Sequence, residues 1–296
     1  EILAEEQREG YRAKKLCFNL TGYSRVNAYV LIPDGEGPFP AVVLLHDHGG
    51  HYTIGKEKMI RPFGVDKAVL DDADAWAANC YGGQYAGDYL AAHGYVVISV
   101  DALYWGERGR KEGADGSKYA DNAGNFMMLG RSLSAFMNYE DMYTTDYLAT
   151  LPEVDPKRIA CMGFSMGGYR AWMLSALSDK IQVGAAICWM TTTDCQFSWE
   201  YGRERGGFAN MLPGIRRYLD YPHIASIACP KPMLFLNGEH DKLFPPIGVR
   251  AAFAEMHEVW ESRSAGDKLV TELWDMPHDC GKKVQAKILD FLNKWL

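Results

Sequence analysis

The sequence predicts an α/β fold in which helices flank an eight-stranded, mostly parallel sheet. Short apolar runs of strand length alternate with amphipathic runs of helix length along most of the chain, and this alternation is typical of a parallel sheet covered on both faces. Three long irregular stretches follow expected strands, at the edge where open α/β sheets bind their ligands. With 296 residues, of which 48% are hydrophobic, we expect a single domain over residues 1–296.

The individual elements follow from hydrophobic periodicity and from turn residues. Strands are expected at residues 15–20, 26–32, 41–46, 95–101, 157–162, 183–190, 232–237 and 268–276. Helices are expected at residues 84–93, 131–151, 166–178, 247–262 and 281–295. The first two strands flank the turn sequence Thr-Gly-Tyr-Ser at 21–24, so they should form an antiparallel hairpin at the edge of the sheet. The irregular stretches 51–82, 103–130 and 191–230 are expected to be insertions that cap the ligand side.

Charge and cysteine content narrow the classes of protein. The net charge is −7 and the pI is near 5.6, and the absence of a basic cluster argues against binding to nucleic acid. No run reaches the roughly 18 to 20 apolar residues that a membrane span needs. The seven cysteines are scattered and odd in number, which favours free thiols and, slightly, a cytoplasmic over a secreted location. A secreted form with disulfides remains an alternative.

The pentapeptide Gly-Phe-Ser-Met-Gly at residues 163–167 lies between an expected strand and an expected helix. A serine at such a turn is held in a strained backbone conformation that only small neighbours permit, with its hydroxyl directed out over the sheet edge. The same pattern also occurs as an ordinary glycine-rich turn. Its position between strand and helix makes Ser165 a candidate nucleophile.

Two partners for Ser165 follow later in the chain. Asp241 lies on the loop after the strand at 232–237, and His278 lies on the loop after the strand at 268–276. Nucleophile, acid and base in this order are typical of one class of serine hydrolase. Asp194, which follows the strand at 183–190, is a competing acid, because a carboxylate there can also reach the base; we favour Asp241.

These three residue types have complementary roles. A serine hydroxyl becomes a good nucleophile when a neutral imidazole accepts its proton, and a buried carboxylate fixes the tautomer of that imidazole. The oxyanion that develops on the substrate also needs preorganised donors. The backbone N–H of Met166 is one expected donor. The loop His-Asp-His-Gly-Gly at 46–50 should supply the second, from His48 or Gly49.

The histidines of that loop have a second interpretation. His46, Asp47, His48 and His51 are residue types that bind zinc or another divalent ion. The glycine pair and the preceding apolar strand already account for the loop, however, and the spacing matches none of the common zinc patterns. We therefore expect no metal site here, and the proposed chemistry needs no cofactor.

The chain as a whole resembles the α/β-hydrolases of the dienelactone-hydrolase-like group, near its bacterial acetyl xylan esterase-like members. The resemblance covers almost the whole chain and rests on residues 46–50, Gly-Phe-Ser-Met-Gly-Gly at 163–168, Asn-Gly-Glu-His-Asp at 237–241 with Phe-Pro at 244–245, and His278. It implies an eight-stranded α/β-hydrolase fold and ester hydrolysis through an acyl-enzyme. Dienelactone hydrolases carry a cysteine in place of Ser165, so their lactone substrate is not implied, and Asp47 replaces a more usual glycine.

The substrate is bounded less closely than the reaction. Trp105 and Arg108 leave a strand end that faces the expected site, and they could contact substrate together with Trp189. Phe197, Trp199 and Tyr201 could extend an aromatic wall, and Arg203 and Arg205 are further candidates for binding a carboxylate. Packing within a cap and solvated arginines are the alternative interpretations.

The absence of strongly apolar lid helices favours short acyl esters, such as acetyl groups on a carbohydrate, as the small-molecule substrate. A compact serine peptidase or aminoacyl hydrolase remains an alternative function. A non-catalytic binding protein with a hydrolase fold is a further alternative.

Overall fold

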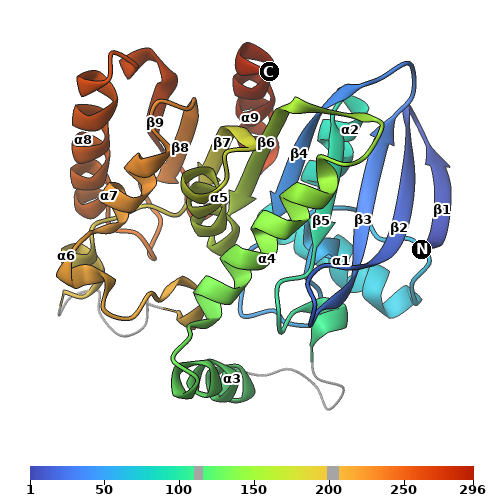
Figure 1. The fold of residues 1–296 in the computed structure, drawn as a ribbon, viewed down its shortest axis with the longest axis horizontal. Coiled ribbons are helices and arrows are strands. Elements are labelled where there is room, and N and C mark those ends of the chain that lie inside the picture. Colours follow the sequence, from blue (N-terminus) through green and yellow to red (C-terminus); the bar gives the residue numbers. More distant parts are fainter. Residues whose placement is uncertain (110–115, 199–206) are drawn as a thin grey trace.

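The computed structural model describes residues 1–109, 116–198 and 207–296. A nine-stranded sheet runs through it in the order β1-β2-β3-β5-β4-β6-β7-β8-β9 (Figure 1). The strands are β1 (Ile2–Arg8), β2 (Tyr11–Asn19), β3 (Arg25–Pro33), β4 (Phe39–Leu45), β5 (Val96–Val100), β6 (Val154–Phe164), β7 (Ile181–Ile187), β8 (Met233–Gly238) and β9 (Leu269–Trp274). Strands β4 to β9 pair in parallel, whereas β1, β2 and β3 pair antiparallel. The mostly parallel sheet predicted from the sequence is confirmed.

The expected number of eight strands was wrong by one. The expected hairpin forms between β2 and β3, but β1 pairs outside β2, so the hairpin is not the edge of the sheet. Strand β1 has the sequence Ile-Leu-Ala-Glu-Glu-Gln-Arg and is largely exposed. An exposed edge strand buries little and carries charges that discourage pairing with other chains, so it lacks the apolar pattern by which strands are found in a sequence.

The structure also has helices where the sequence indicated irregular chain. The helices are α1 (Lys67–Cys80), α2 (Ala86–Ala92), α3 (Gly116–Met128), α4 (Leu133–Leu148), α5 (Met166–Leu177), α6 (Thr193–Gln196), α7 (Tyr221–Ala225), α8 (Pro246–Ser262) and α9 (Lys282–Trp295). Helix α1 lies in the stretch 51–82, α3 in 103–130, and the short helices α6 and α7 in 191–230. The packed residues of α1 (Val69, Ala73, Trp76, Ala77) and of α3 (Tyr119, Ala123, Phe126) do recur at helical spacing, but the polar and small residues between them obscure that pattern in the sequence.

Both faces of the sheet are covered by helices (Figure 1). On β4, Val42 and Leu44 pack in one core with residues of α2 and α9, whereas Val43 and Leu45 pack in another with residues of α4 and α5. All four side chains are completely buried or nearly so. Because alternate residues of a strand face opposite sides, a central strand buried on both faces must be apolar throughout, as residues 41–45 are.

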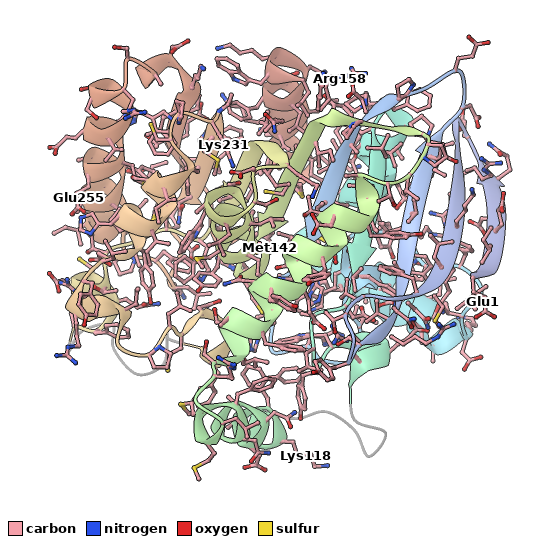
Figure 2. The ribbon with its side chains drawn as sticks, viewed as in Figure 1. Glu1, Lys118, Met142, Arg158, Lys231 and Glu255 are labelled. Atoms are coloured by element: carbon pink, nitrogen blue, oxygen red, sulfur yellow. The ribbon has the colours of Figure 1, made fainter. Side chains whose placement is uncertain are left out.

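One lysine secures the far end of α5, the helix that follows Ser165. The Nζ of Lys231 donates hydrogen bonds to the carbonyl oxygens of Ser175 and Ser178, both at 2.8 Å. Figure 2 shows Lys231 beside the end of this helix. A cation there satisfies carbonyl groups that the helix leaves without partners and interacts favourably with its dipole.

Across the described residues, no helix combines the length and the apolar composition that crossing a membrane would require.

Candidate active site

Ser165 lies at the sharp turn between β6 and α5. Its backbone has φ 56° and ψ −122°, and its N–H donates to the carbonyl oxygen of Ile187 at 2.8 Å. A positive φ is strained for a residue with a side chain and persists only where the surroundings enforce it. The flanking glycines permit this turn: a Cβ on Gly163 would collide with the backbone of Gly167, and one on Gly167 with the carbonyl oxygen of Leu45. The elbow geometry thus follows from the glycines on both sides of Ser165.

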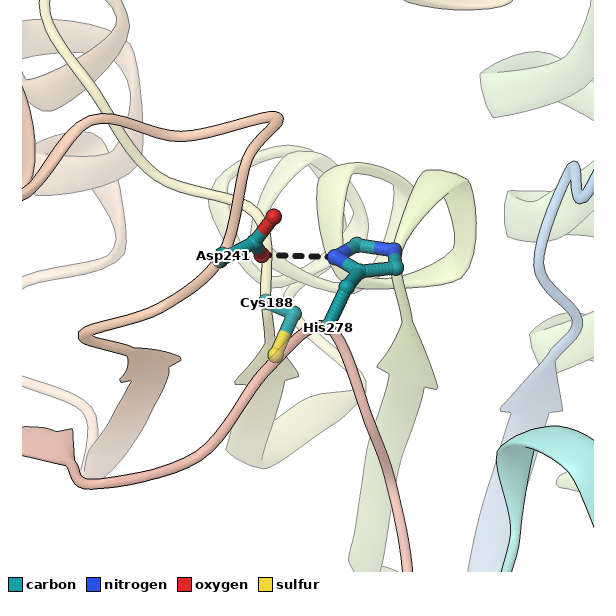
Figure 3. A group of neighbouring side chains, drawn as sticks. All are labelled: Cys188, Asp241 and His278. Carbon is teal, nitrogen blue, oxygen red and sulfur yellow. Dashed lines mark hydrogen bonds and ion pairs between the residues drawn. The ribbon is translucent and has the colours of Figure 1, made fainter.

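Asp241 and His278 are hydrogen-bonded to each other (Figure 3). The Nδ1 of His278 lies 2.6 Å from Oδ2 of Asp241, so the imidazole donates its Nδ1 proton to the carboxylate. The other oxygen, Oδ1, accepts the backbone N–H of Leu243 at 2.8 Å. Both carboxylate oxygens are therefore anchored, and Asp241 is buried.

A glycine allows the loops that carry Asp241 and His278 to meet. A Cβ on Gly238, the last residue of β8, would collide with the carbonyl oxygens of Met276 and Pro277. The backbone N–H of His240 donates to the same Met276 oxygen at 3.1 Å. The loop after β8 and the loop after β9 are thus joined through their backbones, which holds the two side chains in register.

Two phenylalanines border the imidazole of His278, and its environment changes its basicity. Phe164 lies 4.7 Å from the ring centroid, and Phe244 stacks on it at 6.2 Å. Burial opposes a charge on the ring, but the hydrogen bond to Asp241 and the nearby Cys188 outweigh it and raise the pKa of His278 to about 10. Together, these two neighbours favour the protonated imidazole by more than burial disfavours it.

Ser165 and His278 line one cavity of about 630 Å³. Its aromatic wall consists of Trp76, Tyr119, Phe164, Trp189, Phe208 and Phe244, and its polar lining includes Asp47, His48 and Asn210. Within the described residues, no hydrogen bond joins Ser165 to His278. Such bonds are often long without substrate and tighten when it binds. A cavity of this size suits a small molecule, with apolar walls and few polar groups.

The loop at 46–50 contacts the start of α5. The position of Gly167 against Leu45 brings the two backbones together. Across the described part of the chain, no hydrogen bond runs from the backbone N–H groups of His48, Gly49 and Met166 to a protein acceptor, so each stays a candidate donor. The two candidates His48 and Gly49 remain equivalent in this respect.

A buried lysine that the sequence did not single out, Lys58, holds this loop in place through Asp47. The ammonium group of Lys58 donates to Oδ2 of Asp47 at 3.3 Å and to the carbonyl oxygens of Asp47 and His48 at 3.0 and 3.1 Å. The Oδ1 of Asp47 accepts hydrogen bonds from the hydroxyl of Tyr81 at 2.6 Å and from Nε1 of Trp76 at 3.2 Å. Both Lys58 and Asp47 are buried, so Asp47, unusual in such a loop, is a structural anchor. The short Lys-Glu-Lys run at 56–58 offers no periodicity that would reveal it.

The histidines near this loop use their ring nitrogens for hydrogen bonds. The Nδ1 of His46 lies 2.9 Å from the Asp47 carbonyl oxygen, and its Nε2 accepts the N–H of Ala102 at 3.0 Å. The Nδ1 of His48 accepts the Gly50 N–H at 2.9 Å. His51 pairs with Asp72 at 2.7 Å. The four potential ligands considered above therefore have separate partners.

Burial and the neighbouring charge of Lys58 keep the ring of His48 neutral. Burial, followed by the charge of Lys58, lowers the pKa of His48 to about 4. The ring packs edge-on against Trp105, with ring centroids 4.9 Å apart. At neutral pH, His48 therefore adds no positive charge to the cavity.

The expected contact between Trp105 and substrate was wrong. Trp105 is completely buried, is absent from the cavity lining, and donates its Nε1 hydrogen to the carbonyl oxygen of His48 at 3.2 Å. Trp189 does border the cavity, although it is 2% exposed and packs against Tyr221 and Phe244. Trp105 thus supports the loop at 46–50 from behind.

Arg108 was also wrongly expected to contact substrate. Its guanidinium forms a two-pronged ion pair with Glu140, with N–O distances of 2.6 and 2.8 Å, and donates to the Asp101 carbonyl oxygen. This pairing commits two guanidinium nitrogens to Glu140 and Asp101, and Arg108 is absent from the lining of the cavity that Ser165 and His278 share. Trp199, Tyr201, Arg203 and Arg205 lie outside the described residues.

The competing acid, Asp194, lies apart from His278. Its carboxylate is 79% exposed and pairs with Arg216 at 2.6 Å, whereas Asp241 is hydrogen-bonded to the imidazole. Residues 188–193 separate Asp194 from the end of β7, and Asp194 is the second residue of the short helix α6. Of the two carboxylates, the structure brings Asp241 to the histidine.

Comparisons with known proteins agree with this architecture. The chain is 29% identical over 297 residues to "Putative hydrolase YtaP" of Bacillus subtilis (strain 168), covering 100% of this chain and 92% of that protein. A putative acetyl xylan esterase from Bacteroides fragilis NCTC 9343 has a similar fold, with a TM-score of 0.74 at 20% identity, over 93% of this chain and 69% of that one. A glucuronoyl esterase from Solibacter usitatus matches with a TM-score of 0.66 at 14% identity, over 99% and 84%.

At these low identities the structural likenesses establish the fold. The model of the Abhydrolase family, in addition, matches residues 2–264 and so spans most of the chain. The serine elbow after β6 and the helix-covered parallel sheet are the features that such a family shares. This chain therefore belongs to the Abhydrolase family.

Proposed function

We propose that this protein hydrolyses carboxylic esters, with Ser165 as the nucleophile, His278 as the general base and Asp241 as the carboxylate that orients it. The observation that carries the proposal is the 2.6 Å hydrogen bond between His278 and Asp241 beside a cavity that Ser165 also lines. In the neutral imidazole, that bond keeps the proton on Nδ1 and leaves Nε2 as the acceptor.

The reaction proceeds in two steps. The Nε2 of His278 accepts the proton of the Ser165 hydroxyl while its Oγ attacks the ester carbonyl carbon, and the N–H of Met166 with that of His48 or Gly49 stabilises the oxyanion. The imidazolium then returns its proton to the leaving alcohol. Water hydrolyses the resulting acyl-enzyme by the same sequence of proton transfers.

Short acyl esters, with a carbohydrate as the alcohol, are the substrates that we favour. The name of the Bacteroides fragilis neighbour denotes an esterase that acts on acetylated xylan, a carbohydrate. The cavity lining combines aromatic side chains, of which Phe208 is partly exposed, with the polar groups of His48 and Asn210, a mixture that suits a ring with apolar faces and hydroxyl groups.

The test is hydrolysis of p-nitrophenyl esters from acetate to octanoate. The rate should fall with acyl length, and Ser165→Ala should lower kcat/KM by at least about 10⁴-fold, because the nucleophile is lost. Ser262→Ala, at the exposed end of α8, is the matched control and should leave the rate unchanged. A fluorophosphonate probe should label the parent protein and the control but not Ser165→Ala.

Two results would count against the proposal. Turnover that survives in Ser165→Ala would show that Ser165 is not the nucleophile. Labelling at another serine would assign the nucleophile to that serine. A lack of turnover on every ester, with labelling of Ser165 intact, would instead favour the peptidase or aminoacyl-hydrolase alternative, for which aminoacyl nitroanilides are the next substrates.

A further inference from the structure

Cys188 lies beside the pair formed by Asp241 and His278 (Figure 3). Its Sγ, a carboxylate oxygen of Asp241 and a ring nitrogen of His278 are all within 4.8 Å of one another. The three residues follow the carboxyl ends of the adjacent strands β7, β8 and β9. Ester hydrolysis as proposed above uses the carboxylate and the imidazole, but it has no role for the thiol.

The three side chains form a set of zinc ligands. Zinc prefers thiolate, imidazole and carboxylate donors, with bonds of about 2.0 to 2.3 Å, so donors around one ion lie roughly 3 to 4 Å apart in tetrahedral geometry. To hold one ion, Nδ1 of His278 and Oδ2 of Asp241, now 2.6 Å apart, would separate slightly, and Sγ of Cys188 would approach by about an ångström. Three protein donors leave one position for water, as in many open zinc sites.

A second group of potential ligands in the described residues differs from the cluster around Cys188 because it already contains a cation. Glu57, Asp101 and Glu107 also converge, but the ammonium group of Lys56 already lies between them, at 2.7, 2.8 and 2.7 Å from their oxygens. A resident ammonium group therefore already occupies the place that a metal ion would take there. In the described structure, the cluster around Cys188 contains no lysine or arginine partner of this kind: Asp241 accepts from His278 and from the Leu243 N–H.

The backbone holds Cys188 in an uncommon conformation. Its φ is +52°, its N–H donates to the Leu236 carbonyl oxygen at 2.7 Å, and its Sγ lies 3.6 Å from the Asp279 carbonyl oxygen. Non-glycine residues with positive φ are uncommon and concentrate where the surroundings enforce them. The thiol is completely buried, but the His278 side chain is 23% exposed and lines the cavity. Of the three side chains, His278 is therefore the one that borders the cavity.

We propose that Cys188, Asp241 and His278 form an inhibitory site for zinc or a similar thiophilic divalent cation. This inference rests on the proposed function, because the ion would act by engaging its base. Binding displaces the thiol proton of Cys188 and the Nδ1 proton of His278, which is the proton shared with Asp241. The neutral imidazole then carries its one proton on Nε2, so it cannot accept the proton of Ser165.

The test compares p-nitrophenyl acetate hydrolysis with and without Zn²⁺ for each variant, so a change in the metal-free rate does not affect the ratio. Zinc should inhibit the parent protein, and Cys188→Ser should weaken inhibition by at least about 100-fold, because loss of an outer-shell partner alone costs 10- to 100-fold in affinity. Inhibition should strengthen as the pH rises, since metal and protons compete. Cys17→Ser, in β2, is the matched control and should remain zinc-sensitive.

A second measurement does not depend on esterase activity. One equivalent of Cd²⁺ should produce thiolate-to-metal absorption in the parent protein and in Cys17→Ser, and this absorption should be lost in Cys188→Ser and Cys188→Ala. If these variants fail to fold, the anomalous signal of zinc-soaked crystals of the parent protein locates the ion. Equal zinc inhibition in Cys188→Ser, or an anomalous peak only elsewhere, would overturn the proposal. Cadmium absorption in a protein that hydrolyses no ester would support the proposed metal site and contradict the proposed esterase function.

Discussion

At the scale of single residues, Asp241 decides which nitrogen of His278 carries a proton. Its Oδ2 accepts Nδ1–H at 2.6 Å. In Asp241→Asn, the amide can donate to Nδ1, which favours the wrong tautomer, so we expect kcat to fall by about 10⁴-fold with little change in folding. The measurement is steady-state hydrolysis of p-nitrophenyl acetate, with circular dichroism to verify the fold.

Asp194 supplies the matched control for that substitution. Its exposed carboxylate pairs with Arg216, and exposed ion pairs contribute little. Asp194→Asn should therefore leave kcat unchanged. The reverse result, with Asp194→Asn inactive and Asp241→Asn active, would assign the acid role to Asp194 despite the hydrogen bond seen here.

At the scale of elements, the contact between α5 and β4 brings the serine elbow and the loop at 46–50 together. Gly167 packs directly on the Leu45 carbonyl oxygen. Gly167→Ala should displace α5 and lower both the melting temperature and kcat, because neither backbone can yield without disturbing the turn. Gly124→Ala in α3, where an added Cβ meets nothing within 4 Å, should instead stabilise the protein by up to about 1 kcal/mol. Thermal melting distinguishes the two; an unchanged Gly167→Ala would mean that this contact is dispensable.

The loop at 46–50 depends on the buried pair of Lys58 and Asp47. Removing one member leaves an uncompensated buried charge, which costs about 3 to 5 kcal/mol. Lys58→Met and Asp47→Asn should each lower the free energy of unfolding, and the double variant should lose less than the sum of the two. Urea denaturation measures all three. Additive losses would show that the two side chains are not coupled.

At the scale of the whole molecule, protonation of His278 links stability to pH. Its pKa rises from 6.5 in the unfolded chain to about 10, so the folded protein binds the proton more tightly. That stabilisation is fully present below about pH 6.5 and is lost as the pH rises through about 10. The free energy of unfolding of the parent protein, minus that of His278→Gln, should therefore decrease from pH 6 to pH 10 in urea denaturation. A pH-independent difference would contradict the raised pKa.

Activity should change with pH in the opposite direction. The proposed base accepts a proton only in its neutral form, so kcat/KM should increase from neutral pH towards about pH 10. Asp241→Asn removes the carboxylate that stabilises the imidazolium, so the midpoint of its residual pH–rate profile should shift to lower pH. Initial rates across this pH range, with an ester that is stable to hydroxide, test both expectations.

The sequence by itself determined the parallel core of the fold and the candidate residues of the site. Central strands such as β4 are apolar throughout, because both of their faces are buried, and such runs are readily found in a sequence. The glycines at 163 and 167 indicated the serine turn, and chain order indicated Asp241 and His278. These signals are local or follow from a known order of elements.

Only the tertiary structure decided which side chains meet. The hydrogen bond between Asp241 and His278 and the anchoring of Asp47 by Lys58 join residues distant in sequence, and no local pattern specifies such pairs. The structure likewise shows that Trp105 and Arg108 contact protein partners instead of the cavity. A sequence cannot show this, because an aromatic or cationic residue on a loop has the same local pattern in both cases. Strand β1 was missed because a contact distant in sequence, its pairing with β2, makes it a strand. Its own apolar content does not.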